Sequence, residues 1–468
     1  MLELYYMAFK LTFYGGAESV TGSNFLVEGT NGKVLVDCGI EQGRDYVESE
    51  MYAPFPYDVP SIDAVIITHA HLDHVGRLPK LMKEGFKGKV YMTPPTKDLT
   101  ELLLNDSVGI LGDEARRKQL PPLYEERDVT ALLNHIHTVE YHEEWEAASG
   151  LSCVYRHTGH ILGAGSVRIK DVDGTTLALT GDIGSADGAY LPDPEPIEDA
   201  DVIVMESVYG DRLNDKANRV NELRDTLKAA IKRGGAILMP AFSIERTQLM
   251  LYEFSNLMDA GEIPRIHVFL DSPLAINVTE VYEKWGEKYF RQEAKDEIKR
   301  EHDIFKFPFL KETLSREESM EIEKAPNPKV IMAGAGMSHG GRIGRWEQKY
   351  LPDPTTTLMI VGYQAPGSPG RMLQDGAPHV RIDNKDVKVR AKTTSFSGWS
   401  AHADRDGLLD FAKSCLPHTK TFFTALGEPA SARFLAQRIH DFLGVKAIVP
   451  AKGESWQISK QGVKKILS

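Results

Sequence analysis

Residues 69–74 form the stretch that decides the fold, His69-Ala70-His71-Leu72-Asp73-His74. Residues 64–68 before it, Ala-Val-Ile-Ile-Thr, are typical of a buried strand. The chain has 15 His among 468 residues, and three of them fall within these six positions. Imidazole and carboxylate ligands together suit zinc, manganese or iron. The stretch therefore predicts a strand that ends in a metal site.

Two further ligand candidates follow expected strands later in the chain. His160 comes after an expected strand at 152–156, and Asp182 comes after another at 176–180. Glycines beside both residues let the backbone turn sharply and bring the side chain close to an ion. Side chains delivered from several strand ends can meet at one edge of a sheet. His157, three residues before His160, is expected to be an ordinary strand residue.

The number of candidate ligands exceeds what one ion needs. One zinc ion uses three or four protein ligands. The surplus predicts two ions, roughly 3.5–4 Å apart, bridged by Asp182. Such a pair lowers the pKa of a shared water towards about 7 and clamps an anionic centre during displacement. Phosphodiester hydrolysis suits this arrangement best, and hydrolysis of a lactone, thioester or lactam is the competing reaction. The candidate ligands are His69, His71, Asp73, His74, His160 and Asp182.

Length and composition are those of a globular protein with about two to four domains. No apolar run approaches the roughly 18 residues that a membrane helix needs, so no membrane association is expected. Residues 1–10 lack the features of a signal peptide. The three cysteines are far apart and form no Cys-x-x-Cys pair, which favours a reducing, cytoplasmic location.

The net charge of −12 argues against a nucleic-acid substrate, because proteins that bind nucleic acids usually carry a basic surface. Net charge does not describe a local cleft. Two divalent ions would add about +4 there.

The pattern of secondary structure changes in the middle of the chain. Short strands separated by glycine turns are expected over residues 9–37, and helices at 78–85, 98–106 and 113–118. From residue 218 onwards helices and strands alternate, which predicts an open parallel sheet. A last unit has helices around 408–411 and 431–443 with a strand at 421–425 between them. With no repeat or linker, the change indicates an inserted domain.

The motifs resemble the metallo-β-lactamase superfamily and, within it, the β-CASP family of nucleases, in the branch of prokaryotic relatives of the mRNA 3′-end-processing endonuclease. The resemblance covers nearly the whole chain. Besides the ligand motifs it rests on Val20–Ser23, Glu206–Gly210, Pro240–Ser243 with Arg246–Gln248, Asp271–Pro273, Gly334–Met337 with Gly340–Arg342, Gly362–Gln364 with Gly367–Arg371, and Ser400–Asp404.

This resemblance implies an α/β architecture: a metallo-β-lactamase αββα sandwich with an inserted β-CASP domain built on an open, mostly parallel sheet. Residues 1–208 and 396–468 would form the sandwich, and residues 209–395 the insertion. It also implies a metal-dependent ribonuclease, acting on single-stranded RNA as an endonuclease or from the 5′ end. Many relatives dimerise, so a homodimer is an expectation too.

The resemblance assigns roles to individual residues. His69, His71 and His160 would hold one zinc ion, Asp73 and His74 the other, with Asp182 between the two; Mn²⁺ is an alternative metal. His402 would protonate the leaving oxygen, with Glu206 holding its ring. The chemistry is consistent, because a His begins with a pKa of about 6.5 and a carboxylate partner fixes its tautomer and favours its charged form. As an alternative, His402 lies in a polar turn that Asp404 caps.

Several loops of the insertion are suited to phosphate. The glycine-rich segments Gly334–Arg342 and Gly362–Arg371 each combine backbone N–H groups with an Arg, and Arg246 opens a helix. Taken singly, each of these signals is weak. The expected substrate contacts are Ser243, Arg246, Asp271, Ser272, Gly340, Arg342, Gly370 and Arg371.

One position departs from the family pattern. RNA-cleaving members carry a His-Gly-Glu near the C-terminus, whose His completes the second metal site, whereas this chain has Leu426-Gly427-Glu428. A leucine has no lone pair to offer, so we expect a weaker second site. DNA-directed members also have an apolar residue here.

Four functions are therefore open at this point. The first is a metal-dependent ribonuclease, and the second is a DNA nuclease of the same mechanism. The third is a small-molecule hydrolase, which leaves His402, Glu206 and the insertion without a role. The fourth is a weakly active or inactive RNA-binding relative, because of Leu426.

Overall fold

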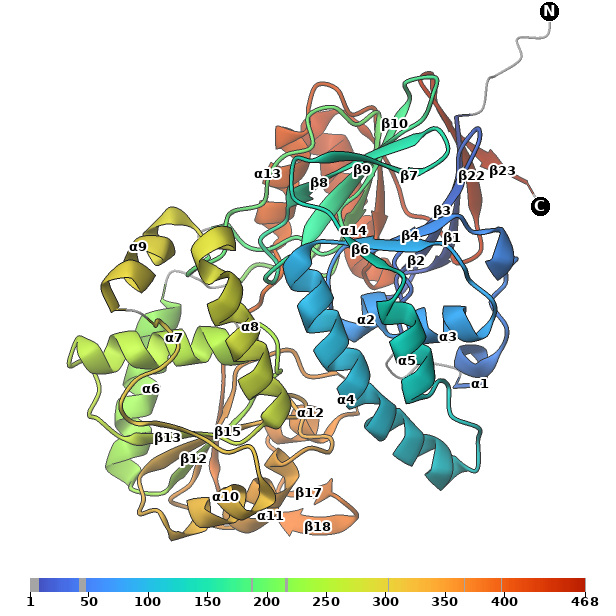
Figure 1. Cartoon of the computed structure of the whole chain (residues 1–468). Helices are drawn as coiled ribbons and strands as arrows, with labels where there is room; N and C mark the ends of the chain where they lie inside the picture. The colour runs from blue at the N-terminus through green and yellow to red at the C-terminus, as the bar shows by residue number, and fades with distance from the viewer. Residues whose placement is uncertain are drawn as a thin grey trace, which may run out of the picture. The chain divides into compact units, whose positions relative to one another are not determined.

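The computed structural model describes residues 8–41, 48–186, 188–214, 218–301, 303–365, 367–396 and 398–467. The chain forms two compact units (Figure 1). Unit 1 comprises Met1–Leu213 together with His402–Ser468, and unit 2 comprises Asn214–Ala401. The domain boundaries expected after residues 208 and 395 stay a prediction.

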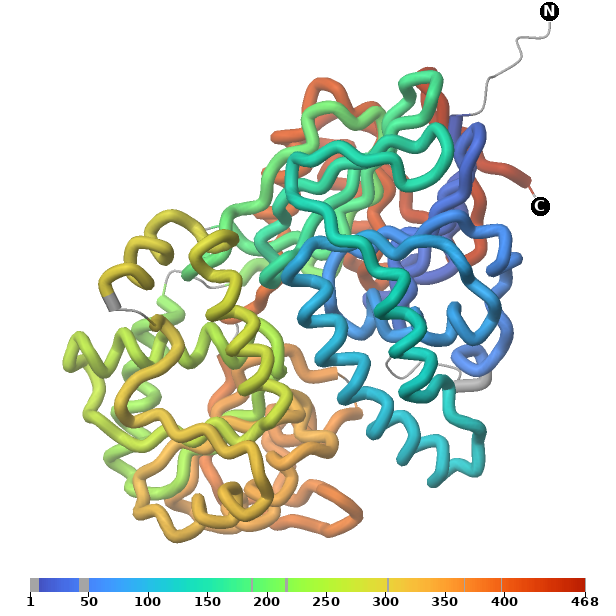
Figure 2. Tube along the Cα trace, in the orientation of Figure 1, coloured from blue at the N-terminus to red at the C-terminus, as the bar shows by residue number. Residues whose placement is uncertain are grey.

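Unit 1 contains two sheets. The first has eight strands in the order β23-β22-β1-β2-β3-β4-β5-β6. Their bounds are β1 Phe9–Gly15, β2 Asn24–Glu28, β3 Lys33–Val36, β4 Ala64–Ile66, β5 Lys89–Met92, β6 Ile136–Thr138, β22 Ser455–Ser459 and β23 Gly462–Ile466. The C-terminal hairpin of β22 and β23 extends this sheet beside the first strand, so the two ends of the chain share one sheet (Figure 2).

The second sheet has seven strands in the order β21-β20-β11-β10-β9-β8-β7. Their bounds are β7 Glu144–Ala148, β8 Leu151–His157, β9 Gly165–Lys170, β10 Thr176–Leu179, β11 Val202–Glu206, β20 Thr421–Ala425 and β21 Lys446–Ile448. Strand β20 follows unit 2 in the sequence, yet it belongs to this sheet and pairs in parallel with β11.

Alternating side chains on these strands build four layers. In β11, Val202 and Val204 face the core between the two sheets, and Ile203 and Met205 face the helices outside. The helices outside the first sheet are α2 Leu72–Val75, α3 Leu78–Lys83, α4 Pro94–Lys118 and α5 Glu126–Leu133, and those outside the second are α13 Arg405–Ser414 and α14 Pro429–Leu443. The short elements α1 Glu48–Tyr52 and η1 Val59–Ser61 complete the unit. The predicted αββα sandwich is confirmed.

Unit 2 is built on a six-stranded parallel sheet in the order β14-β13-β15-β12-β16-β19. Its strands are β12 Ala236–Pro240, β13 His267–Leu270, β14 Leu310–Glu312, β15 Lys329–Ala333, β16 Thr357–Ile360 and β19 Lys392–Ser395. A hairpin of β17 His379–Ile382 and β18 Lys385–Lys388 stands apart from this sheet. The helices are α6 Arg219–Arg233, α7 Arg246–Asp259, α8 Pro273–Tyr289, α9 Gln292–Glu301, α10 Arg316–Glu321, η2 Ile322–Lys324, α11 Ile343–Tyr350 and α12 Pro369–Gln374. The predicted parallel sheet is confirmed.

One element differs from the prediction. The two helices expected at 98–106 and 113–118 are a single helix, α4, of 25 residues. Gly109 and Gly112 suggest a break, but neither ends the helix, since Thr93 caps its beginning and Gln119 adopts a left-handed conformation at its end. Among the described helices, none is long and apolar enough to cross a membrane. The cytoplasmic location and the homodimer stay predictions.

Candidate metal centre

Four candidate ligands follow the ends of three strands in unit 1. His69 and His71 come after β4 of the first sheet, His160 after β8 of the second, and Asp182 after β10. Both β8 and β10 run antiparallel to β9, so they point the same way and end at the same edge of their sheet. The topology of the sandwich thus brings together residues that lie up to 113 positions apart (182 minus 69).

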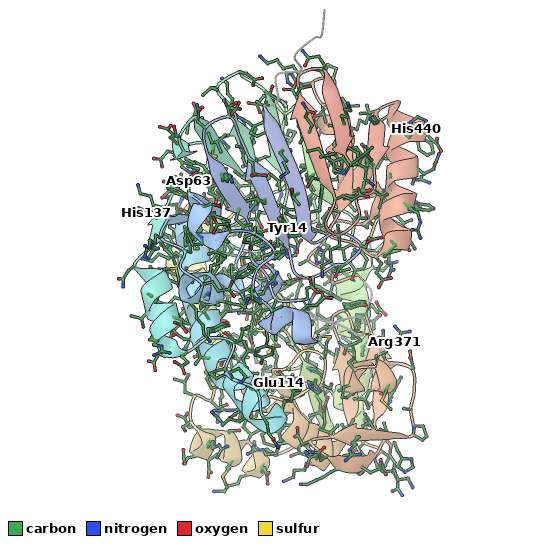
Figure 3. The ribbon with its side chains drawn as sticks, turned by 90° about the vertical axis from the view of Figure 1, so that its right-hand side faces the viewer. Tyr14, Asp63, Glu114, His137, Arg371 and His440 are labelled. Atoms are coloured by element: carbon green, nitrogen blue, oxygen red, sulfur yellow. The ribbon has the colours of Figure 1, made fainter. Side chains whose placement is uncertain are left out.

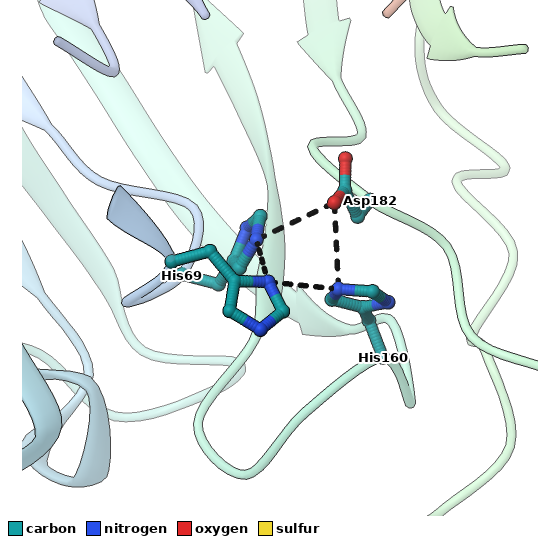
Figure 4. Close-up of side chains that lie close together, drawn as sticks. His69, His160 and Asp182 are labelled. Carbon is teal, nitrogen blue, oxygen red and sulfur yellow. Dashed lines mark hydrogen bonds and ion pairs between the residues drawn. The ribbon is translucent and has the colours of Figure 1, made fainter. Parts of the chain in front are cut away.

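The ligand atoms of these four residues surround one point. His71 Nδ1 lies 3.1 Å from His69 Nε2 and 3.2 Å from His160 Nε2. Asp182 Oδ2 lies 3.5 Å from His69 Nε2 and 3.4 Å from His160 Nε2 (Figure 4). Bonds of about 2.0–2.1 Å to a tetrahedral ion place its ligand atoms about 3.3 Å apart. These four pairs of ligand atoms have that spacing, and all four atoms lie within 4.8 Å of one another, so the residues could hold one divalent ion.

The protonation states suit metal binding as well. Burial lowers the pKa of His69 and of His160 well below the usual range of a histidine. Burial also lowers the pKa of His71 to about 4, although Asp182 opposes it. For Asp182, burial raises the pKa, but His74 and His69 outweigh it and hold the pKa well below the usual range. Neutral imidazoles and an ionised carboxylate are the forms that bind metal.

The two oxygens of Asp182 face different groups. Oδ2 faces His69 and His160, whereas Oδ1 lies 3.5 Å from His74 Nε2. Among the described residues, the group of converging ligand atoms comprises only His69, His71, His160 and Asp182. Asp73 lies on the short helix α2, outside this group. The assignment of Asp73 and His74 to a second ion stays a prediction.

Two glycines allow the loops that carry the ligands to approach each other. Gly181 has φ +58°, and a Cβ there would lie 2.6 Å from Thr68 Oγ1, beside His69. A Cβ on Gly184 would lie 2.6 Å from the backbone nitrogen of His160. Any larger residue at either position would push the loop of Asp182 away from the other ligands.

Asp37 is a residue of the centre that was not expected from the sequence. It is buried, and Oδ2 accepts a hydrogen bond from His74 Nδ1 at 2.7 Å. Its carboxylate also accepts from the backbone N–H of Thr68 at 2.9 Å and from the hydroxyl of Thr68, which in turn lies 3.1 Å from His69 Nδ1. Hydrogen bonds at Nδ1 leave Nε2 of both rings directed at the centre, which is how outer residues orient metal ligands.

A signal for Asp37 is present in the sequence. The apolar run of β3 ends in Asp37, as the run of β4 ends in His69, and the two strands are parallel neighbours. A carboxylate directly after a buried strand, next to the strand that carries the ligands, marks a residue at the same edge of the sheet.

Glu206 and His402 form a second pair beside the ligands. Glu206 ends β11 and is fully buried, and both of its oxygens lie 3.2 Å from His402 Nδ1. The backbone N–H of Ile183 also donates to Glu206. His402 Nδ1 lies 4.0 Å from Asp182 Oδ2, and its ring is 4.5 Å from that of His160. The pair thus adjoins the four converging ligands, with 21% of the His402 side chain exposed.

The pKa values of this pair are coupled to the centre. Burial lowers the pKa of His402, but the carboxylates of Glu206 and Asp182 outweigh it and raise the pKa to about 9. For Glu206, burial raises the pKa and outweighs the lowering by the nearby His402. Before metal binding, the two carboxylates thus favour the charged form of His402, and its Nδ1 is held by Glu206.

Leu426 occupies a buried position between the two sheets. It is 1% exposed and belongs to the core that includes Phe25 and Ala425. Its backbone N–H donates to the carbonyl of Gly16 at 2.6 Å, and its φ is +49°. The side chain contributes to apolar packing and offers no ligand atom.

Two of the residues expected to contact substrate, Asp271 and Arg342, are bonded to each other in unit 2. Asp271 is fully buried and accepts hydrogen bonds from Arg342 Nη1 at 2.7 Å, Trp346 Nε1 at 2.7 Å and Ser319 Oγ at 2.7 Å. Arg342 also donates to the carbonyls of Thr313 and Leu314. These bonds hold the loops after β13 and β15 together, and a contact of Asp271 or Arg342 with substrate stays a prediction.

The other candidates lie on the loops that follow the parallel strands of unit 2. The hydroxyls of Ser272 and Ser243 are 3.6 and 3.8 Å from the position that a Cβ would take at Gly334. Arg246 is buried at the start of α7. These residues come from the loops after β12, β13 and β15, so the structure brings the three loops together, and their contact with substrate stays a prediction.

The last three candidates differ in their surroundings. Gly370 packs against Gln364, whose Oε1 lies 1.8 Å from where a Cβ would be. Arg371 forms an ion pair with Asp375 at 3.0 Å. At Gly340 a Cβ would meet open space. Close packing therefore accounts for a glycine at position 370. Gly340 faces open space, and Arg371 pairs with Asp375 at the surface.

Comparison with known proteins shows the family to which the chain belongs. The chain matches the Metallo-beta-lactamase superfamily over residues 20–241, the Beta-Casp domain over 247–373 and the Zn-dependent metallo-hydrolase RNA specificity domain over 386–450. The chain therefore belongs to the β-CASP family of the metallo-β-lactamase superfamily, as the motifs indicated.

Individual relatives cover most of the chain. A protein named Ribonuclease TTHA0252 from Thermus thermophilus is 36% identical over 86% of this chain and 90% of its own length. An RNase J-like protein from Methanocaldococcus jannaschii is 30% identical over 95% and 98%. Transcription termination factor FttA from Methanosarcina mazei is 30% identical over 93% and 70%. A crystal structure of a protein of unknown function from Enterococcus faecalis shares the fold, with a TM-score of 0.55, 14% identity, and 96% and 99% coverage.

We expect Asp37→Asn to weaken metal binding about 10- to 100-fold, because the amide has one accepting oxygen where the carboxylate has two and must lose either the bond from His74 or the bond from the Thr68 N–H. Competition with a zinc chelator measures the affinity. Asp171→Asn is the matched control, since Asp171 is also buried in unit 1 but bonds Thr30. Equal losses of affinity in both variants would mean that Asp37 supports the fold and not the ligands.

Proposed function

We propose that this chain is a ribonuclease that uses a divalent metal ion to hydrolyse phosphodiester bonds in single-stranded RNA. The observation that carries the proposal is the convergence of four ligand atoms, whose neighbouring pairs lie 3.1–3.5 Å apart, directly beside the Glu206–His402 pair. The relatives named as ribonuclease and RNase J-like support RNA as the substrate. Endonucleolytic cleavage is the proposed mode, and cleavage from the 5′ end is the alternative.

Zinc is the proposed metal. Three imidazoles and one carboxylate form a donor set that suits zinc, whereas manganese prefers sites richer in oxygen. When bound, such an ion supplies a water of lowered pKa and offsets the negative charge of the phosphate group. Asp73 and His74 are the proposed protein ligands of a second, weaker ion, since Leu426 contributes none.

The chain's own residues orient the ligands and supply the proton for the leaving oxygen. Asp37 and Thr68 fix the ring orientations of His74 and His69. Glu206 holds Nδ1 of His402, which leaves Nε2 as the nitrogen that gives a proton to the leaving oxygen. The burial of the ligands limits competing water around the reacting phosphate.

We expect the metal-loaded chain to cut single-stranded RNA and Asp182→Asn to cut at the background rate, since this variant loses the charge shared by the imidazoles. RNA and DNA oligonucleotides of the same sequence, labelled at the 5′ end, show the products on a gel. Metal content per chain is measured in parallel. Cleavage of DNA but not RNA would favour a DNA nuclease, and binding of RNA without cleavage would favour an inactive relative.

His402→Ala should lower the cleavage rate about 10²- to 10⁴-fold with metal content unchanged. The acid form is needed, so the wild-type rate should fall as pH rises through the pKa of His402. That pKa is about 9 before metal binding, and a cation at Asp182 lowers it, which places the fall between roughly 6.5 and 9. Rate–pH profiles of both proteins check this. Loss of zinc from His402→Ala would contradict its role as an acid.

Leu426→His tests whether the missing ligand limits the second site. A histidine tolerates the positive φ of this position. We expect the number of bound zinc ions per chain, or the cleavage rate at low zinc, to rise in this variant. Leu426→Asn is the control for lost apolar packing. If neither quantity rises above the wild type, the second ion does not depend on this position.

A further inference from the structure

A second cluster of metal-binding side chains lies in unit 1, outside the four converging ligands. His142 lies in the turn before β7, His157 ends β8, and Glu195 lies in the loop between β10 and β11. One ligand atom from each residue lies within 4.8 Å of the other two. Three segments of the chain, separated by up to 53 positions (195 minus 142), thus meet at one point.

The backbone fixes the relative positions of the three residues. His142 donates its backbone N–H to the carbonyl of Tyr155 at 3.0 Å. Glu195 is bonded twice to His157: its N–H donates to the His157 carbonyl at 2.9 Å, and its Oε2 accepts from the His157 N–H at 3.1 Å. Strand β8 thus fixes the backbone of all three residues: His157 belongs to it, and His142 and Glu195 are hydrogen-bonded to it. The cluster therefore does not depend on flexible surface side chains alone.

The rings are oriented as well. The His157 ring stacks on Tyr141, with 3.5 Å between ring centroids, and the hydroxyl of Tyr141 donates to the carbonyl of Ala164 at 2.8 Å. His142 Nε2 lies 3.4 Å from Glu195 Oε1, while His142 Nδ1 lies 3.3 Å from Arg156. The distance from Nε2 to Oε1 is close to the spacing of about 3.3 Å between two ligands of a tetrahedral zinc ion.

We propose that His142, His157 and Glu195 form a separate zinc site. Two imidazoles and a carboxylate are a zinc ligand set, and the exposure of His142 (51%) and Glu195 (34%) lets an ion enter and leaves a position for water. The site does not depend on the catalytic centre and is independent of the proposed ribonuclease function.

The position of the site gives it a structural role. Glu195 belongs to the segment that follows Asp182, and this segment supports the catalytic pair: the N–H of Ala403 donates to the Ile183 carbonyl at 2.7 Å, and the Ser185 hydroxyl donates to the His402 carbonyl at 3.0 Å. An ion at Glu195 ties this segment to β8, the strand that leads to His160. A zinc ion here would therefore stabilise both the loop after Asp182 and the loop that carries His160.

Arg156 provides an internal check. Its guanidinium is the cation next to His142 in the structure, and it competes with a bound ion by charge repulsion. Arg156→Gln should therefore bind zinc at this site more tightly than the wild-type chain. Weaker binding in this variant would contradict coordination through His142.

The direct experiment removes the main centre first. His69→Ala/His74→Ala deletes one imidazole ligand from each of the two ions proposed for the centre, and the full-length variant is dialysed against zinc alone before zinc per chain is measured. We expect about one zinc ion per chain to remain, and adding His142→Ala or Glu195→Gln to remove it. Adding His137→Ala, an exposed histidine on β6 that is labelled in Figure 3, should leave it in place.

The same comparison in the otherwise wild-type chain guards against misfolding of the multiple variants. There, His142→Ala should contain one zinc ion fewer than wild type and His137→Ala the same number. The proposal is overturned if the doubly substituted chain holds no zinc, or if its zinc survives His142→Ala. Neither result bears on RNA cleavage, which is measured separately.

Discussion

The buried carboxylate of Asp182 is the group on which the centre depends. It is 5% exposed, yet three imidazoles lie within 3.5 Å of its two oxygens. An ionised carboxylate is costly to bury without a cation. Without metal, His74 meets this need: burial lowers its pKa, but Asp182 and Asp37 outweigh burial and raise it well above the usual range. The centre is thus built around a negative charge that a divalent ion satisfies better than a single proton.

The fold delivers this charge and its partners to one place because both sheets of the sandwich contribute. The imidazoles of His69 and His71 come from the first sheet, and those of His160 and His402 accompany the second. The glycines at 181 and 184 let the second set approach the first. Asp37 binds Nδ1 of His74, and Glu206 binds Nδ1 of His402, so each carboxylate orients one imidazole. The four converging ligands are thus arranged to bind an ion, and the Glu206–His402 pair beside them is arranged to hold a proton.

The sequence predicted the fold and the converging residues because their signals are local. The His-rich stretch follows an apolar run, and the glycines around His160 and Asp182 are adjacent to them. Asp37 was missed because a single carboxylate after a strand is common, and its contact with His74 spans 37 positions. The pairing of β22 with β1 could not be predicted either, because it joins segments from the two ends of the chain. The continuous helix α4 was split in the prediction because its two glycines are tolerated inside a long helix.

The loops of unit 2 gave weaker predictions, because their residues suit more than one role. Glycine-rich loops with an arginine suit phosphate, but they also suit close packing. Gly370 and Arg342 are engaged within the unit, which a sequence cannot distinguish from exposure. The cluster of His142, His157 and Glu195 had no sequence signal at all, because its members come from three separate segments.

The most direct test of the central claim is anomalous scattering from crystals grown with zinc, recorded on both sides of the zinc absorption edge. We expect a peak about 2 Å from His69 Nε2, His71 Nδ1, His160 Nε2 and Asp182 Oδ2. A fully loaded crystal without a peak there, or with these imidazoles turned away from one another, would contradict it.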